Sequence, residues 1–172
     1  TDPSSFKDAQ FPIEQISWDE AALFCRKLTL AAAGTLPAGY QYRLPTEAEW
    51  ECACRAGSTG AYAGSGVLEE MGWYIDNSDN QTHAVAGKRP NAWGFYDMHG
   101  NVWEWCRDWY GEYPALELTD PAGPPKGNER VLRGGAWFSE PSHCRSAHRG
   151  QRWMGRRDCR LGFRMALAPE IP

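Results

Sequence analysis

The stretch RGGAWFSEPSHCRSAHRG, residues 133–150, gathers side chains that could do chemistry in one loop-like run. It contains one thiol, Cys144, and a redox pair or a Cu(I) site would need a second thiol close by. Five residues earlier stands Ser139. A hydroxyl is a hard, neutral ligand that does not replace a thiolate at copper, and a lone thiolate cannot form such a site by itself. The loop therefore holds half of the residues that a soft-metal oxidation centre needs.

Two other cysteine patterns offer little chemistry. Cys144 and His148 could begin a zinc site, but no second Cys/His pair follows at zinc spacing. Cys52 and Cys54 fall within a helical pattern, which favours packing for Cys54 over a redox role. The sequence has no glycine-rich phosphate loop and no evident Ser-His-Asp set.

Arginines crowd the segment that follows, with Trp153 and His148 among them. On a surface, guanidinium groups match carboxylate, sulfate and phosphate, and interleaved aromatic rings also admit single-stranded nucleic acid. The alternative is that they pair with carboxylates and carbonyls of the same chain. The seven are Arg145, Arg149, Arg152, Arg156, Arg157, Arg160 and Arg164.

The composition predicts a turn-rich globular protein. The 172 residues carry a formal net charge of −4, which favours neither nucleic acid nor a membrane surface as partner. Eighteen Gly and twelve Pro indicate many turns and little regular helix. No apolar run reaches the length of a membrane span, and the N-terminus does not read as a signal peptide. We interpret most of the six cysteines as buried thiols of a cytoplasmic protein, with a secreted, disulfide-linked protein as the alternative.

Two helices are predicted by their capping boxes. Ser17 with Glu20 begins one over residues 17–29, and Thr46 with Glu49 begins another that Gly57 closes. Strands are predicted in residues 101–111, 130–137 and 161–167, where apolar residues alternate or cluster. Two helices on a small antiparallel sheet, topped by long loops, make one α+β domain over residues 1–172. Loops of this length are usually functional.

These segments, in this order, resemble the formylglycine-generating enzyme (sulfatase-modifying factor) family. The resemblance implies a C-type-lectin-like fold and extends from Asp2 to Leu167. The family domain normally begins well upstream, so its usual N-terminal portion would be missing, or another polypeptide would complete the fold. The matching segments are PIEQISWDEAALFC, YRLPTEAEWECACRAG, WYIDNSDNQTHAVAGKRPNAWGFYDMHGNVWEWCRDWYG, RVLRGGAWFSEPSHCRSAHRG and LGFRMA.

The resemblance also bears on the thiol. Enzymes of this family bind Cu(I) with two cysteines and oxidise a substrate cysteine to formylglycine. Their second cysteine matches Cys144, their first falls on Ser139, and a catalytic serine falls on Ala136. We therefore do not expect a Cu(I) site. The rival hypothesis is an oxidoreductase in which Cys144 is catalytic, alone or with Cys159.

A structural calcium ion is implied by the same family. Its members coordinate calcium with an Asx side chain, two backbone carbonyls and a Glu side chain, and the matching residues here are Asp97, Gly100, Val102 and Glu104. Hard oxygen donors of this kind suit calcium. The alternative is that Asp97 caps a turn and Glu104 pairs with an arginine.

The expected function is ligand binding without catalysis. Relatives that lack the cysteine pair serve as ligand-binding or partner-binding domains, including diversified receptors, and a specificity domain attached to a kinase or protease is a further alternative. The family also suggests structural roles for Arg145 and Arg164. We expect a peptide or protein ligand at the C-terminal loop, through Trp137, Phe138, Ser139, Glu140, His143, His148, Arg152 and Trp153.

Overall fold

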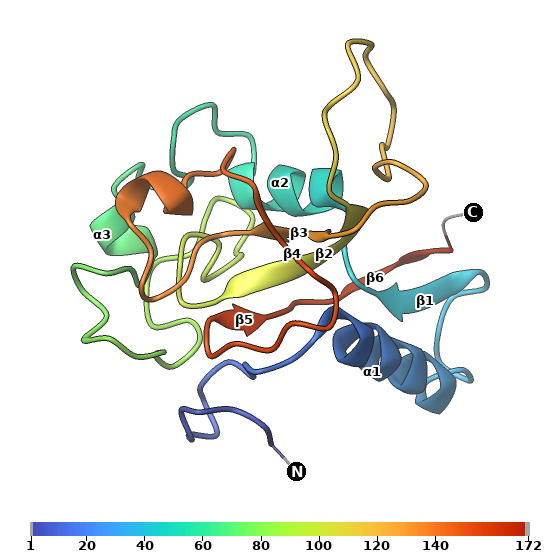
Figure 1. Ribbon diagram of the computed structural model, residues 1–172, viewed down its shortest axis with the longest axis horizontal. Coiled ribbons are helices and arrows are strands. Elements are labelled where there is room, and N and C mark those ends of the chain that lie inside the picture. Colours follow the sequence, from blue (N-terminus) through green and yellow to red (C-terminus); the bar gives the residue numbers. More distant parts are fainter. Residues whose placement is uncertain (1, 171–172) are drawn as a thin grey trace.

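The computed structural model describes residues 2–170 and shows an α+β fold with short elements and long loops (Figure 1). The elements are α1 (Trp18–Ala31), β1 (Tyr40–Arg43), α2 (Glu47–Arg55), α3 (Leu68–Met71), β2 (Trp103–Trp109), β3 (Arg130–Arg133), the 3-10 helix η1 (Pro141–Cys144), β4 (Gly150–Arg152), β5 (Leu161–Gly162) and β6 (Ala166–Pro169).

Both predicted helices form where their capping boxes place them. The Ser17 and Thr46 side chains accept the backbone N–H groups of Glu20 and Glu49, whose carboxylates accept in return. Helix α2 ends at Arg55, two residues before the predicted Gly57, because Ala56 adopts the left-handed conformation, with φ of 45°. The first turns of both helices are thus fixed by the capping-box hydrogen bonds that the sequence predicts.

The sheets differ from the prediction in two respects. The main sheet has the order β4-β3-β2-β5, and β5 runs parallel to β2, so the sheet is mixed rather than antiparallel. The predicted strand over residues 161–167 is split, because β6 leaves this sheet and pairs with β1. Strand β3 ends at Arg133, since Gly134 and Gly135 turn the chain with positive φ.

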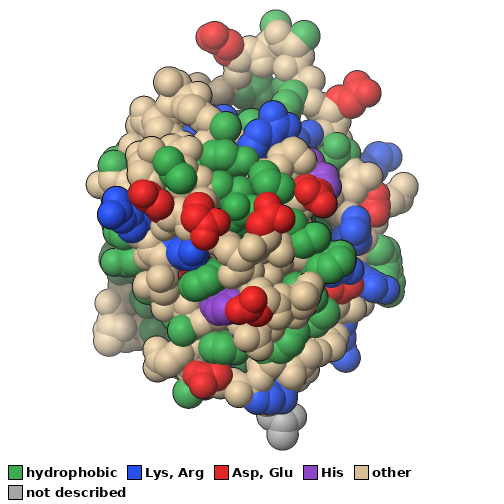
Figure 2. Space-filling model, turned by 90° about the vertical axis from the view of Figure 1, so that its left-hand side faces the viewer, with side chains coloured by type: hydrophobic (Ala, Val, Ile, Leu, Met, Phe, Trp, Pro, Cys, Tyr) green, Lys and Arg blue, Asp and Glu red, His purple; other side chains and the backbone are tan. Residues whose placement is uncertain are grey.

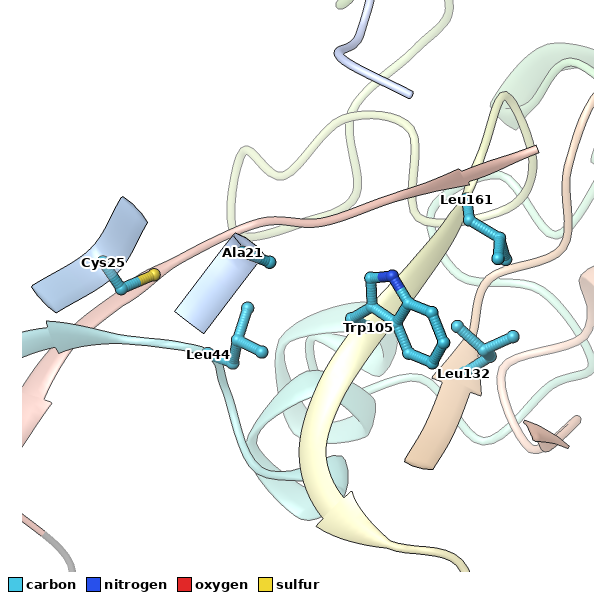
Figure 3. Close-up of a cluster of buried hydrophobic side chains, with 6 residues drawn as sticks. All are labelled: Ala21, Cys25, Leu44, Trp105, Leu132 and Leu161. Atoms are coloured by element: carbon cyan, nitrogen blue, oxygen red, sulfur yellow. The ribbon is translucent and has the colours of Figure 1, made fainter. Parts of the chain in front are cut away.

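Strand β2 lies at the centre of the fold and is buried on both faces. On one face, Trp105 packs with side chains from α1, β3 and β5 (Figure 3). On the other face, Cys106 packs with Trp50 and Cys54 of α2 and with Val131 of β3. The alternation predicted for this strand is therefore confirmed, although both faces are covered.

The cysteines of the described residues are free, and four of the six are buried: Cys25, Cys54, Cys106 and Cys144. Among residues 2–170, none of the helices is long and apolar enough to cross a membrane.

Candidate functional site

A groove of about 490 Å³ lies beside η1 and the strands β2, β3 and β4. We call it the loop groove. Five of the eight ligand-contact residues predicted from the sequence line it, so the fold brings them together around one hollow. The lining residues are Trp103, Tyr110, Leu132, Phe138, Ser139, His143, His148, Arg149, Gly150, Gln151, Arg152, Asp158, Arg160 and Leu161.

The other three predicted contact residues lie outside this lining. Trp137 is half-buried, packs edge-to-face on Phe6 and donates its indole N–H to the carbonyl of Cys159. This ring has a structural role in holding the N-terminal segment. Trp153 and Glu140 are exposed beside the groove, and Trp153 is 63% exposed. Both stay predictions as contacts for a large ligand.

Two imidazoles stand together in the groove. The rings of His143 and His148 are 4.6 Å apart between centroids, and His148 also lies against Trp103 at 5.7 Å. Burial lowers the pKa of His148, and the neighbouring His143 and Arg145 add to this effect. The pair therefore favours the neutral form of His148 at neutral pH, which can both donate and accept hydrogen bonds.

The arginines of the groove fall into two groups. The guanidinium of Arg149 holds the buried carboxylate of Glu47 through two hydrogen bonds of 2.6 and 2.7 Å, and Arg160 holds Asp158 at 2.7 Å. Among the described residues, no carboxylate pairs with Arg152, whose guanidinium donates to the carbonyl of Gln151. Arg152 is thus the groove cation with free hydrogen-bonding capacity.

The remaining arginines mostly have partners within the chain. Arg164 pairs with Glu104, which confirms its structural role, and Arg145 donates to the carbonyl of Ser142 in the same turn. Arg156 and Arg157 form exposed ion pairs with carboxylates. Charged side chains of both signs are interspersed on the face that carries α3 and η1 (Figure 2).

The single thiol of the loop does not face the groove. Cys144 is fully buried against Leu68 and Tyr74, and this burial raises the pKa of its thiol to about 12. A thiolate is the form that attacks substrates and binds soft metals. The hydroxyl of Ser139, at the place of the missing cysteine, accepts the N–H of Ala136 at 2.9 Å. These residues do not fit a Cu(I) site.

The four positions expected to hold calcium are close in sequence, but one of the side chains is already engaged. Both carboxylate oxygens of Glu104 accept hydrogen bonds from Arg164, and the Trp50 indole N–H donates to one of them at 2.7 Å. One oxygen of Asp97 accepts the N–H of Ala86, and the other is buried without a partner among the described residues. As the side chains lie, this set does not fit calcium. Binding would require Glu104 to exchange Arg164 for the ion, so calcium at Asp97, Gly100, Val102 and Glu104 stays a prediction.

A buried ion-pair network beneath the groove was missed by sequence reasoning. Arg133 is fully buried, pairs with Glu47 and Glu51, and donates to the carbonyls of Ser146 and His148. It therefore ties α2 to the backbone of the loop that lines the groove. The sequence offered one indication of this network, namely that Glu47 and Glu51 lie one helical turn apart and so face the same side of α2. The sequence alone did not show that a buried arginine pairs with both.

The chain matches known proteins over nearly its whole length. The family model of the sulfatase-modifying factor enzyme 1-like domain matches residues 2–169. A serine/threonine-protein kinase, pkn1 of Chlamydia pneumoniae, is 43% identical over 129 residues, which are 72% of this chain and 20% of the kinase. The formylglycine-generating enzyme of Streptomyces coelicolor is 35% identical, over 90% of this chain and 52% of the enzyme.

A solved structure has the same fold. The Treponema denticola variable protein 1 superposes with a TM-score of 0.90 at 31% sequence identity, covering 98% of this chain and 78% of that one. The chain thus spans about a fifth of the kinase and about half of the enzyme. On the strength of the family model, which covers almost every residue, the chain belongs to the family of sulfatase-modifying factor enzyme 1-like domains.

Proposed function

We propose that this chain is a non-catalytic member of its family that binds a peptide or protein segment in the loop groove. The proposal rests mainly on the different burial of the thiol and of its neighbours in one loop. The thiol on which the family's oxidation chemistry depends is sealed in the core, while the neighbouring aromatic, imidazole and guanidinium groups line an open groove.

The case against catalysis rests on the two positions of the cysteine pair. Cys144 has its thiol in an apolar cluster, and burial holds it in the protonated form. Ser139 supplies a neutral hydroxyl that already accepts a backbone N–H. A serine at this position gives copper no second soft ligand.

The side chains of the groove favour a ligand that carries carboxylates. Its lining contains three arginines, of which Arg149 and Arg160 are already held by carboxylates of the chain, so Arg152 is the one left for a ligand. Arg152 has no ion-pair partner in residues 2–170 and can form a two-point interaction with a carboxylate. Phe138, 49% exposed, adds apolar contact area at the edge. Aromatic and arginine side chains contribute much of the binding energy in protein interfaces.

The relatives support a place within a larger protein. The kinase matches this chain over a fifth of its own length, so the matching part is one portion of a longer polypeptide. We therefore propose that the chain acts as a ligand-specificity domain attached to an effector.

Peptide display against the purified protein tests the proposal. Selected peptides should be acidic, and Arg152→Glu should weaken their binding at least tenfold, because the change replaces an attraction by a repulsion. Arg26→Glu, an equal charge change on the exposed surface of α1, is the matched control and should leave binding within about twofold. Selected peptides that bind both variants as well as the parent would contradict the proposal.

A further inference from the structure

A second, larger cavity lies on another part of the molecule. It has a volume of about 800 Å³ and is bounded by the first turns of α2, the end of β2 and the loop of residues 111–124. This loop rises above α2 in Figure 1. We call this second cavity the acidic cavity, because its lining contains four carboxylates. Its lining residues are Glu47, Ala48, Glu51, Cys52, Asp108, Gly111, Glu112, Tyr113, Pro114, Leu116, Leu118, Pro121, Ala122, Gly123, Pro124 and Arg149.

The walls of the acidic cavity are mainly apolar, and several of their side chains are left exposed. Leu116 is 78% exposed, Tyr113 63% and Leu118 57%. Three prolines and two glycines add further carbon-lined surface to the loop side of the cavity. The cavity is therefore suited to the apolar body of a ligand.

The charges of the lining are unequal. Four carboxylates face the cavity against one guanidinium, that of Arg149. Glu47 is neutralised by Arg149 and Arg133, and Glu51 by Arg133 and Arg55. Among the described residues, neither Asp108 nor Glu112 forms an ion pair. Two of the four carboxylates of the lining thus have no ion-pair partner within residues 2–170, although the charges of Arg107 and Arg130 act on Asp108.

Asp108 is the carboxylate best placed to receive a cation. It is 4% exposed, and it accepts the backbone N–H of Glu47 at 2.8 Å. Burial, with the charge of Glu47 as a lesser cause, raises the pKa of Asp108 to about 6. A buried carboxylate without a cationic partner is costly when ionised, and a ligand cation beside it would remove part of that cost.

Anions do not suit this cavity, because its one guanidinium is occupied. Arg149 donates three hydrogen bonds, two to Glu47 and one to the carbonyl of Gly111, and its guanidinium carbon lies 4.5 Å from the ring centroid of Tyr110 and 4.0 Å from that of Tyr113. An anionic ligand would have to displace Glu47.

From these charges and this lining we infer that the acidic cavity is a second binding site, which takes a primary ammonium group carried on an apolar chain. The lysine side chain of a peptide and a free alkylamine share this chemistry. The ammonium would lie beside Asp108, and the apolar chain would lie against Leu116 and Leu118. The inference concerns a different cavity and does not depend on the proposed function of the loop groove.

The exposed thiol of Cys52, in the lining, provides a direct reporter. The protein is treated with a maleimide, and the rate at Cys52 is read by peptide mapping, which separates it from Cys159. Hexylammonium, hexanol and hexanoate are compared as ligands of equal length. Hexylammonium should slow the reaction at Cys52 at least threefold, hexanol less, and hexanoate not at all.

A variant and its control locate the interaction. Asp108→Asn keeps an acceptor for the N–H of Glu47 and should abolish protection by hexylammonium, whereas Asp76→Asn, an exposed carboxylate elsewhere, should not. Arg152→Glu should leave protection unchanged, which separates this site from the loop groove. A lysine-containing peptide compared with its Nε-acetylated form distinguishes a peptide ligand from a free amine. Equal protection by hexanol and hexylammonium in the unaltered protein would overturn the inference, whatever the folding of the variants.

Discussion

The guanidinium of Arg164 forms a two-point ion pair with the buried carboxylate of Glu104, in the centre of the main sheet. Glu104 is 5% exposed, and the indole of Trp50 donates to the same carboxylate. A cation that belongs to the chain thus neutralises the glutamate that the family resemblance assigns to calcium. Calcium could bind Glu104 only by displacing Arg164, so the competition between the two cations can be measured.

If Glu104 can bind calcium, replacing Arg164 should free its carboxylate for the ion. Arg164→Met leaves Glu104 buried without its counterion, so we expect the free energy of unfolding to fall by about 3 kcal/mol. Calcium should raise the melting temperature of this variant and shift that of the parent by no more than about 1 °C. Arg156→Met, which removes an exposed ion pair, is the control. Strong stabilisation of the parent by calcium, reversed by a chelator, would contradict the expectation that Arg164 occupies the place of the ion.

Arg133 should contribute strongly to the stability of the fold beneath the loop groove. The fully buried guanidinium joins Glu47 and Glu51 to the carbonyls of Ser146 and His148. Arg133→Met removes the guanidinium donor to both carbonyls and one of the two cations beside each glutamate, and urea denaturation should show that the free energy of unfolding falls by about 3–5 kcal/mol. Arg43→Met removes a less buried pair with Glu49 and should cost less. A loss of similar size in both variants would show that the network has no special role.

The thiols should react in the order of their burial. In the native protein, the exposed Cys52 should react with a maleimide within minutes, whereas Cys144 should react only when the protein is unfolded. The reason is that Cys144 is fully buried and, with a pKa near 12, stays protonated at neutral pH. Peptide mapping of the labelled protein checks this order. Rapid native labelling of Cys144 would reopen the oxidoreductase hypothesis.

Asp108 should make stability depend on pH. The pKa of this carboxyl is about 6 in the folded protein, against 3.8 when it is unperturbed. Well below pH 3.8 the group is protonated in both states and does not affect the free energy of unfolding. As pH rises from about 4 to about 6, the unfolded state ionises first, so folding stability falls, by up to about 3 kcal/mol.

The variant Asp108→Asn isolates this contribution, since its side chain is neutral at every pH. Between pH 4 and pH 6, the free energy of unfolding of the parent should fall relative to that of the variant. Above about pH 6 the difference should level off. A difference that is constant with pH would contradict the raised pKa of Asp108.

The sequence was most informative where local chemistry decides the structure. The capping boxes at Ser17 and Thr46 predict both helix starts, since the interactions lie within four residues. The alternation around Trp105 predicts the central strand. The family resemblance suggests eight ligand-contact residues, of which five line the loop groove, whereas Trp137, Glu140 and Trp153 do not.

Interactions distant in sequence could not be predicted. Nothing local shows that Arg133 reaches α2 or that β5 pairs in parallel with β2. The sequence allowed Glu104 to pair with an arginine, but only the fold shows that this arginine is Arg164, sixty residues away. The acidic cavity was missed for the same reason, because Asp108 and the loop that covers it meet only in three dimensions.

The central claim is that this chain binds a ligand and does not oxidise cysteine. The most direct measurement incubates the purified protein with a cysteine-containing peptide, Cu(I), a thiol reductant and dioxygen, and follows the peptide by mass spectrometry. We expect the peptide cysteine to give no aldehyde above the level seen without protein. Aldehyde formation that depends on the protein, and that is lost in Cys144→Ala, would contradict it.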